Sequence, residues 1–538
     1  MKQLILFAGI VCYSILFSQC SSGNNSKKVE SEELITEDEM SEKDEKEDGI
    51  REAMEMEFER TKDISLGYIP KERLVSAYNE LLQQRRSGTG IASRVSALTW
   101  TERGPNTDVI GPSNGNTRGP GSTAVTSGRM RAIFVDLADV TNRTVWAASV
   151  SGGLWKTTDI SASPAGWQLI NDFLGNLAIT SICQNPVKPD TMYFGTGEMN
   201  GNLGSVRGGG IWKSIDHGVT WNLLSNTTGF YNVSKIACDA SGNLYVGTQG
   251  SGAGLQRSND GGKNWIEITP STASRGSRIT DIKFSNTGRM HVTKGFNGSP
   301  ANTAGYFYTD NPAAVDSLTW TAPLVPFSTQ YNCEMAVAGN TLYMLPSNSS
   351  WTTPQIYKST DGGATWLATA TSPPSTSTEP SINTGQGWYD LAIGVDPSDP
   401  NIVIAGGLNF YRSQDGGNTW NQISRWVGTA LPYVHADHHI VVWKGNQILM
   451  GTDGGIFYST DYGNSFSDRN VGLRIKQFYS CAIHPTTTNY FLAGAQDNGT
   501  HQLTNAGLGG STEVLGGDGG FVHIDEDEPQ YQFGATTY

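Results

Sequence analysis

One short pattern recurs along this chain and constrains its fold more than any other feature. The pattern is Ser-x-Asp-x-Gly-x-Thr-Trp, with Asn in place of Thr in one copy. Clear copies begin at Ser214, Ser258, Ser359 and Ser413, and weaker copies begin at Thr157, Thr309 and Ser459. The aspartate can accept backbone N–H bonds across a turn, the glycine supplies a positive φ, and the tryptophan covers neighbouring strands. We therefore interpret each copy, called an Asp box below, as a structural hairpin turn.

The spacing of the boxes predicts the architecture. Successive aspartates lie about 50 residues apart, which is the length of a four-stranded propeller blade. Abundant glycine, 64 of 538 residues, and sparse charge, 16%, suit many short strands joined by tight turns. We predict an all-β, multi-bladed β-propeller over residues 97–538, with about eight four-stranded blades and a partial ninth. The last blade stops at Tyr538, so we expect a chain truncated at its C-terminus, or a ring completed by a strand near 97–102.

The N-terminus has the pattern of a targeting signal. Lys2 precedes an apolar run at 4–17 that is too short to span a bilayer as a mature helix. The run ends at Cys20, as in a bacterial lipoprotein, so residues 1–20 are predicted to be a signal peptide with Cys20 acylated. We expect an exported outer-membrane or cell-surface lipoprotein, held to the membrane only by this lipid, or a secreted protein if Cys20 is not acylated.

Two further segments precede the repeats. Residues 21–63 are polar and strongly acidic, which predicts a flexible linker. Residues 64–96 contain apolar residues at helical spacing and then a Ser/Gly hinge, which predicts a short amphipathic helix. The net charge of −14 argues against nucleic acid as the partner, because phosphate binding needs a basic surface.

The cysteines within the repeats do not form a metal-binding pattern. They occur at what we take to be the same place in four different units, at Cys183, Cys238, Cys333 and Cys481. No Cys-x-x-Cys pair indicates zinc, so we predict four buried free thiols.

The polar residues with the potential for chemistry are expected on the face opposite the boxes. In a propeller the turns from strand C to D occupy one face, and the B–C and D–A loops surround the channel on the other. To this loop face we assign Glu198, Trp388, Asp390, His435, Asp437, His439, Asp453, Asp497 and Asp518. The loop from His435 to His439 and the loop with Asp453 belong to one blade, so we expect them to approach each other.

Three interpretations of this face stay open on the residues alone. Asp453 with Asp437 or Asp497 could hydrolyse a glycosidic bond by acid–base catalysis. A divalent metal could bind to His435, Asp437 or His439 with a neighbouring carboxylate. The third interpretation is structural, with buried polar groups that bond the loop backbone around the channel.

A sialidase is a weaker alternative. It needs several arginines that converge on a carboxylate. The candidates on the loop face are Arg129, Arg207 and Arg425, and they suggest no convincing triad.

An ordered set of motifs resembles a known class of proteins. The set comprises SGGLWKTTD at 151–159, GTGE at 195–198, GQGWYD at 385–390, HADHH at 435–439, GTDGGIFYSTDYG at 451–463, QDNGT at 496–500 and GGDGG at 516–520. It resembles the secreted Asp-box, or BNR-repeat, β-propellers of Bacteroidetes, which are described as glycosyl-hydrolase-like or sortilin N-terminal-domain-like.

The resemblance implies a cell-surface propeller and leaves two functions open. Xyloglucan-cleaving propellers carry an Asp in a D-x-G-G loop of an early blade, where this chain has Val150. Sortilin-type relatives bind peptides through the channel and have no catalytic residues. We expect the loop face to bind an extracellular glycan or polypeptide; the alternative is a glycoside hydrolase that uses the carboxylates of Asp437, Asp453 and Asp497.

Overall fold

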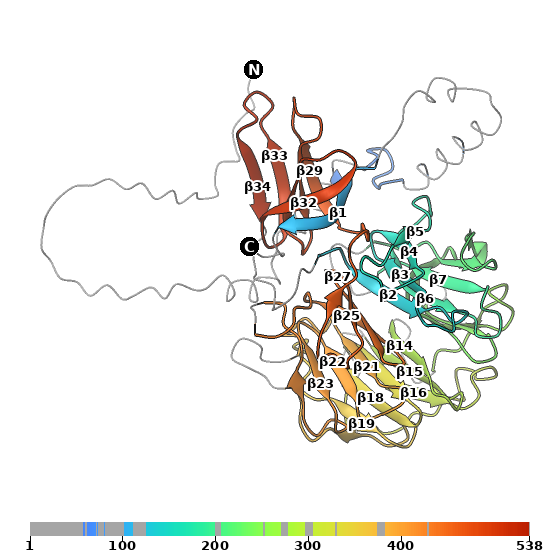
Figure 1. Ribbon diagram of the computed structural model, residues 1–538. Coiled ribbons are helices and arrows are strands. Elements are labelled where there is room, and N and C mark those ends of the chain that lie inside the picture. The colour runs from blue at the N-terminus through green and yellow to red at the C-terminus, as the bar shows by residue number, and fades with distance from the viewer. Residues whose placement is uncertain are drawn as a thin grey trace, which may run out of the picture.

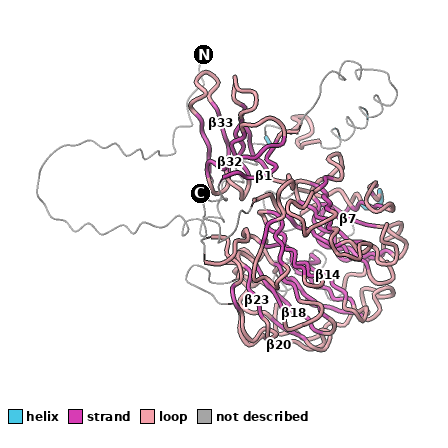
Figure 2. Tube along the Cα trace, in the orientation of Figure 1, coloured by secondary structure: helices cyan, strands magenta, loops and turns pink. Residues whose placement is uncertain are grey.

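The computed structural model describes residues 58–59, 62–70, 73, 80, 102–110, 125–198, 206–250, 253–270, 278–295, 305–328, 331–373, 382–427 and 430–536. Strands and loops make up nearly all of them (Figure 2), with a short 3-10 helix, η2 (Ser225–Thr227). The predicted signal peptide with Cys20, most of the acidic linker and nearly all of the predicted helix lie outside these residues. Among the described residues, no helix is long and apolar enough to cross a membrane.

Seven antiparallel sheets follow one another along the chain, and each pairs its strands in sequence order. The first three sheets contain β2 (Met130–Val135), β3 (Val145–Ser149), β4 (Gly153–Thr157) and β5 (Gln168–Leu169); β6 (Ile179–Gln184), β7 (Met192–Thr196), β8 (Ile211–Ser214) and β9 (Asn222–Leu223); and β10 (Phe230–Cys238), β11 (Leu244–Gly250), β12 (Gly254–Ser258) and β13 (Ile266–Glu267).

The fourth and fifth sheets contain β14 (Arg278–Phe284), β15 (Met290–Gly295) and β16 (Gly305–Thr309); and β17 (Cys333–Ala338), β18 (Thr341–Pro346), β19 (Tyr357–Ser359) and β20 (Leu367–Ala368). The sixth and seventh contain β21 (Ala392–Val395), β22 (Val403–Gly406), β23 (Phe410–Ser413) and β24 (Asn421–Gln422); and β25 (His438–Lys444), β26 (Gln447–Thr452), β27 (Gly455–Ser459) and β28 (Ser467–Asp468). The fourth sheet has a single bridge from Tyr308 to Thr321 where a fourth strand is expected.

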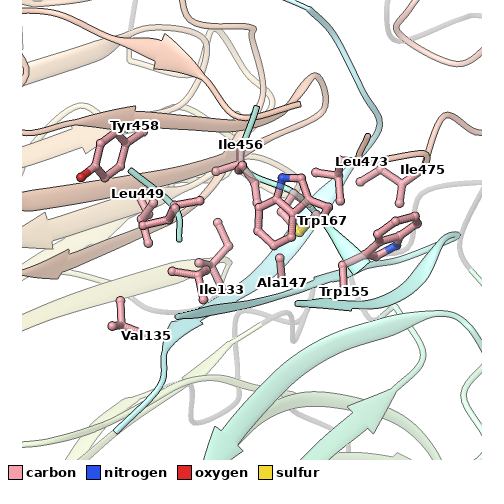
Figure 3. Packing of buried hydrophobic residues seen from close by; sticks show 14 residues of the cluster. Ile133, Val135, Ala147, Trp155, Trp167, Leu449, Ile456, Tyr458, Leu473 and Ile475 are labelled. Carbon is pink, nitrogen blue, oxygen red and sulfur yellow. The ribbon is translucent and has the colours of Figure 1, made fainter. Parts of the chain in front are cut away.

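The seven sheets close into a ring (Figure 1). The first strand of the ring, β2, packs against β25 and β26 of the seventh sheet. Figure 3 shows the apolar cluster at this closure, where Ile133 and Trp155 of the first sheet meet Leu449 and Ile456 of the seventh. The indole of Trp167 also donates a hydrogen bond to the carbonyl of Arg469, at 2.5 Å. The predicted β-propeller is thereby confirmed, but the described residues form a ring of seven blades, and the predicted eighth and partial ninth blades lie outside it.

The Asp boxes are the C–D turns of these sheets, as predicted. In the fifth sheet the Asp361 carboxylate accepts bonds from the main-chain N–H and the hydroxyl of Thr365, at 2.9 and 2.6 Å. The Ser359 hydroxyl accepts a bond from the Gly363 N–H at 2.9 Å. The Trp366 ring then packs edge-on against Tyr306 of the fourth sheet, with 5.2 Å between ring centroids. Each box therefore closes one hairpin and contributes an aromatic ring to the contact between blades.

Two more sheets lie outside the ring and form the second unit. One contains β29 (Phe478–Ile483), β30 (Phe491–Ala495), β31 (Thr500–Leu503) and β32 (Leu508–Leu515), and the other contains β33 (Gly519–Ile524) and β34 (Gln532–Thr536). The expected strand near 97–102 lies almost wholly outside the described residues. Strand β1 (Gly104–Ile110) pairs in parallel with β32, because the outer edge of that sheet offers unpaired backbone groups.

Candidate functional site

The predicted site residues gather where the loops of the ring meet the second unit. Glu198 follows β7, and Trp388 and Asp390 precede β21. His435 to His439 lead into β25, and Asp453 lies between β26 and β27. Asp497, between β30 and β31, and Asp518, between β32 and β33, approach from the second unit. The loops thus converge, although Asp497 and Asp518 belong to sheets outside the ring and not to the eighth and ninth blades that the sequence predicted.

The carboxylate of Asp453 is the centre of a buried network, called the Asp453 hub. Its Oδ1 accepts a hydrogen bond from His439 Nε2 at 2.5 Å and lies 3.4 Å from Nε of Arg129. Its Oδ2 accepts the hydroxyl proton of Tyr389. Burial alone would raise the pKa of Asp453, but His439, Arg129 and Tyr389 hold it well below its usual range. Asp453 is therefore ionised, with both carboxylate oxygens engaged.

Glu198 extends this network to the second blade. Both of its carboxylate oxygens accept bonds from Arg129 Nη1, at 3.1 and 3.0 Å, and Oε1 accepts a third from Arg131 Nε at 3.1 Å. Arg131 also donates to the carbonyl of Tyr389 at 3.1 Å. Burial raises the pKa of Glu198, but the two guanidinium groups outweigh it and lower the pKa. Loops of four blades are therefore joined by charged contacts.

Asp437, Asp453 and Asp497 form the second feature, called the aspartate cluster. One carboxylate oxygen from each lies within 4.8 Å of the others. Asp437 and Asp453 are buried, whereas Asp497 is partly exposed and its main-chain N–H donates to Asp518 Oδ1 at 2.5 Å. Burial and the neighbouring carboxylates raise the pKa of Asp437 and of Asp497 well above their usual range. The cluster therefore combines one carboxylate whose pKa is lowered with two carboxyl groups whose pKa values are raised.

This arrangement can support proton transfer. Acid–base pairs arise where environments push two pKa values apart, so that one group gives a proton and another stays charged. Retaining glycosidases hold their carboxyl groups about 5 Å apart, and inverting ones about 6.5–9.5 Å. The three carboxylate oxygens of the aspartate cluster lie within 4.8 Å of one another, which is near the separation in retaining enzymes.

The same three oxygens could surround a cation, since carboxylates are preferred ligands of calcium. Among the described residues, the aspartate cluster is the group of histidine, cysteine and acidic side chains with this geometry. Of the predicted set of His435, Asp437 and His439, only Asp437 belongs to it. His435 Nε2 faces the carbonyl of Asp497 at 3.1 Å, and His439 Nε2 bonds Asp453.

A polar cavity continues from the Asp453 hub into the ring. It has a volume of about 60 Å³ and is lined in part by Arg131, Glu198, Lys235, Glu334 and His439. By the same measure one water needs about 10–15 Å³, so this space holds roughly four waters and no sugar ring. A glycan would therefore have to bind on the loop face and not in the channel.

Two members of this buried network were not singled out from the sequence. Tyr389 and Arg131 are absent from the predicted set, although Tyr389 stands between Trp388 and Asp390. Asp390 is buried and Trp388 half-buried, 5.2 Å from the ring of Tyr389. The available signal was the pair Arg129 and Arg131, two positions apart at the start of β2. Apolar residues are the norm in such a buried strand.

The three arginines considered for a sialidase do not act together. Arg129 is occupied by Glu198, and Arg207 stacks over Tyr231, 3.6 Å from the ring centroid. Val150 lies in the loop between β3 and β4 and is buried.

No family model matches this sequence. A xyloglucanase of Paenibacillus sp is 24% identical over 349 residues, which cover 53% of this chain and 30% of the relative. A xyloglucanase of Hypocrea jecorina is 25% identical over 421 residues, which cover 68% of this chain and 46% of the relative. The chain therefore spans less than half the length of these two curated relatives.

Solved structures confirm the fold. The GH74 xyloglucanase of Xanthomonas campestris aligns with a TM-score of 0.50 and 15% identity, over 76% of this chain and 71% of the other. A GH74 enzyme of Niastella koreensis aligns with a TM-score of 0.50 and 16% identity, over 79% and 71%. At this identity the likeness establishes the β-propeller fold alone. The resemblance to BNR-repeat and sortilin-type proteins stays a prediction.

Proposed function

We propose that this chain hydrolyses glycosidic bonds in an extracellular glycan of the xyloglucan type, with its reacting groups at the edge of the aspartate cluster. The observation that carries the proposal is the presence of three carboxyl oxygens within 4.8 Å, with pKa values shifted in opposite directions, where the ring meets the second unit. The substrate class is taken from the relatives, which are named xyloglucanases.

The proposal assigns the proton donor to Asp497. Its carboxyl group has a raised pKa, and it is the member of the cluster that is partly exposed. Burial raises this pKa most, and the nearby carboxylates of Asp518 and Asp453 raise it further, which favours the protonated form. Asp518, which is also partly exposed and accepts the Asp497 N–H, is the second carboxylate.

The reaction then follows the usual course for two carboxyl groups. Asp497 gives its proton to the glycosidic oxygen as the bond from that oxygen to the anomeric carbon breaks. Water adds to the anomeric carbon and its proton passes to Asp518, so the scheme is an inverting one. The 4.8 Å limit applies to the oxygens of the aspartate cluster and not to Asp518. Asp453 has no direct role in this scheme, because His439, Arg129 and Tyr389 occupy its oxygens.

Glycan binding without cleavage is the second candidate. It is favoured by Val150, which stands where the resemblance leads us to expect an aspartate and which is buried. In that case the loop face would hold the polysaccharide through its half-buried groups, such as Trp388 and Asp518.

One experiment separates the two candidates. Xyloglucan, an unbranched β-glucan and starch are each tested for retardation of the protein in affinity gels and for release of reducing ends. We expect retardation and release with xyloglucan, and a loss of release of about 100-fold or more in Asp497→Asn with retardation unchanged. Asp527→Asn, an exposed carboxylate in the loop between β33 and β34, is the matched control.

The outcomes are distinct. Retardation without release in the wild type supports binding alone. Release that survives in Asp497→Asn removes Asp497 from the reaction, and the absence of both signals with all three glycans overturns the proposal.

We also propose export with acylation of Cys20, on the pattern of the first twenty residues. Labelling of bacterial cells with a palmitate analogue should mark the wild type and not Cys20→Ala. Label in both proteins, or in neither, would contradict this.

A further inference from the structure

Two cysteines meet between the second and third blades. The sulfur of Cys183, in β6, lies 3.5 Å from the sulfur of Cys238, at the end of β10. They are 55 residues apart in sequence and come from different sheets. No other described pair of cysteines has a sulfur–sulfur contact in the structure, since Cys333 packs on Met344 and Cys481 is exposed.

The strand register explains why these two side chains face each other. Cys183 pairs with Tyr193, the second residue of β7, whereas Cys238 pairs with Leu244, the first residue of β11. Cys238 is therefore offset by one residue from the place that Cys183 occupies in its own blade. Side chains alternate between the two faces of a strand, so this offset turns Cys238 toward the second blade while Cys183 points toward the third.

The surrounding packing agrees with the register. Both cysteines contact the same apolar cluster, which includes Tyr193 and Ile236. Ala237, the true equivalent of Cys183, instead packs against the next cluster along the ring. The expectation that the cysteines share one place in the repeat is therefore wrong, since Cys238, Cys333 and Cys481 each pair at a different position from Cys183, and the offset of Cys238 creates the contact. The prediction of four buried thiols is also wrong, because only Cys333 is buried.

We propose that Cys183 and Cys238 form a disulfide bond that links the second and third blades. The sulfurs need to approach by about 1.5 Å to reach the usual bond length of ~2.05 Å, a change within reach of small side-chain rotations. Both residues are partly exposed, although they pack against an apolar cluster. The blades are otherwise joined here by side-chain packing, without a shared strand pair.

The reaction is a thiol–disulfide exchange. The thiolate of one cysteine attacks an external disulfide, forms a mixed disulfide and expels one external thiol. The second cysteine attacks this mixed disulfide and expels the other thiol. The pair on the protein is thereby oxidised, the external disulfide is reduced to two thiols, and the two protons lost by the cysteines end on those thiols. Burial raises the pKa of Cys183, so we expect slow exchange that accelerates with pH.

The test uses the full chain in buffers of reduced or oxidised glutathione. After incubation the protein is acid-quenched, denatured and alkylated, and its free thiols are counted by mass spectrometry. In oxidised glutathione we expect two fewer thiols, a mass lower by about 2 Da and one cross-linked peptide pair that contains Cys183 and Cys238. The thermal midpoint should rise relative to the reduced protein, because the link restricts the unfolded chain.

The controls use the other thiols. Cys481→Ser should lose two thiols like the wild type, and Cys183→Ser should lose none. The wild-type peptide map does not depend on whether any variant folds. An unchanged thiol count in oxidised glutathione, or a cross-link that includes Cys333 or Cys481, would overturn the inference. These results are independent of glycan hydrolysis, because both sulfurs lie in the second and third blades, away from the aspartate cluster.

Discussion

Arg129 and Glu198 form an ion pair at 3.0 Å with exposed side-chain fractions of only 3% and 2%. Arg129 precedes the first strand of the first blade, and Glu198 follows the second strand of the next one. Two charges removed from water at this depth are tolerated only while they stay paired and hydrogen-bonded. The pair therefore joins the first and second blades on the loop face.

Replacement of Glu198 by Gln should destabilise the protein strongly. It leaves Arg129 and Arg131 as buried cations with fewer partners, at a cost of about 3–5 kcal/mol in the free energy of unfolding. Glu102→Gln makes the same chemical change in the exposed pair with Arg474 and should cost less than about 1 kcal/mol. Urea titrations measure both, and equal costs would show that the Glu198 contacts contribute no more than a surface pair.

The sequence predicted the repeat unit better than it predicted the partners within the site. The boxes and the alternation of short strands follow from local chemistry, because an Asp, a Gly and a Trp at fixed spacing can close only a hairpin. The approach of His439 to Asp453 also followed, since both loops belong to one blade. Tyr389 and Arg131 could not be assigned in this way, because their contacts with Asp453 and Glu198 depend on which blades the closed ring brings together. The same dependence explains β1, whose pairing with β32 joins segments about 400 residues apart.

A methyl group at the box glycine should disrupt a contact between blades. Gly363 has φ of +87°, and a Cβ there would lie 1.8 Å from the hydroxyl of Tyr306 in the preceding sheet. Gly363→Ala should therefore cost the strain of the left-handed backbone, about 1–2 kcal/mol, and in addition the displacement of Tyr306. Gly445→Ala is the matched control, because its φ is +58° and no atom lies within 4 Å of the new Cβ. The thermal midpoint of Gly363→Ala should lie clearly below that of Gly445→Ala. Equal midpoints would contradict the close contact.

Acidification should destabilise the protein between about pH 6.5 and pH 4. Burial lowers the pKa of His439, His291 and His501 to about 4, below the unfolded value near 6.5. The unfolded chain then binds more protons in this window, so stability is full above pH 6.5 and is lost toward pH 4, by up to about 1.4 kcal/mol per pH unit for each histidine. His435 and His438 have lowered pKa values and act in the same direction.

Four acidic groups oppose this trend. The raised pKa values of Asp172, Asp437 and Asp497, and that of Glu334 at about 7, stabilise the fold at low pH and lose that effect as pH rises. The five histidines outnumber these acidic groups, so the free energy of unfolding should rise with pH over this window. Urea titrations at several pH values measure it, and His291→Gln should reduce the slope by up to one proton. A stability that is flat or rises on acidification would contradict the burial of neutral histidines.

Calcium should leave the stability unchanged. In the proposed function Asp437 and Asp497 carry protons, and a cation would have to displace both in order to bind the cluster. We therefore expect the same thermal midpoint with millimolar calcium and with a chelator, and the same rate of sugar release. A midpoint that rises with calcium in the wild type and not in Asp437→Asn would favour a metal site over the acid–base scheme.

Loss of Asp108 should loosen the second unit and spare the ring. Asp108, on β1, accepts hydrogen bonds from the main chain and hydroxyl of Thr126, at 2.9 and 2.7 Å, and lies 3.5 Å from Nζ of Lys476. Burial raises the pKa of Asp108, but Lys476 and His501 outweigh it, so the carboxylate is charged. In Asp108→Ala the buried ammonium of Lys476 loses its ion pair, at a cost of about 3–5 kcal/mol.

Hydrogen exchange locates that cost. Amides of β1 and β29–β32 should exchange faster in Asp108→Ala, whereas β2–β28 should keep their protection, because the ring closes through β2, β25 and β26 without β1. Asp527→Asn, an exposed carboxylate in the same unit, should leave both patterns as in the wild type. Faster exchange that extends evenly over all the sheets would mean that the ring and the second unit unfold together, and that β1 holds one cooperative structure instead of two.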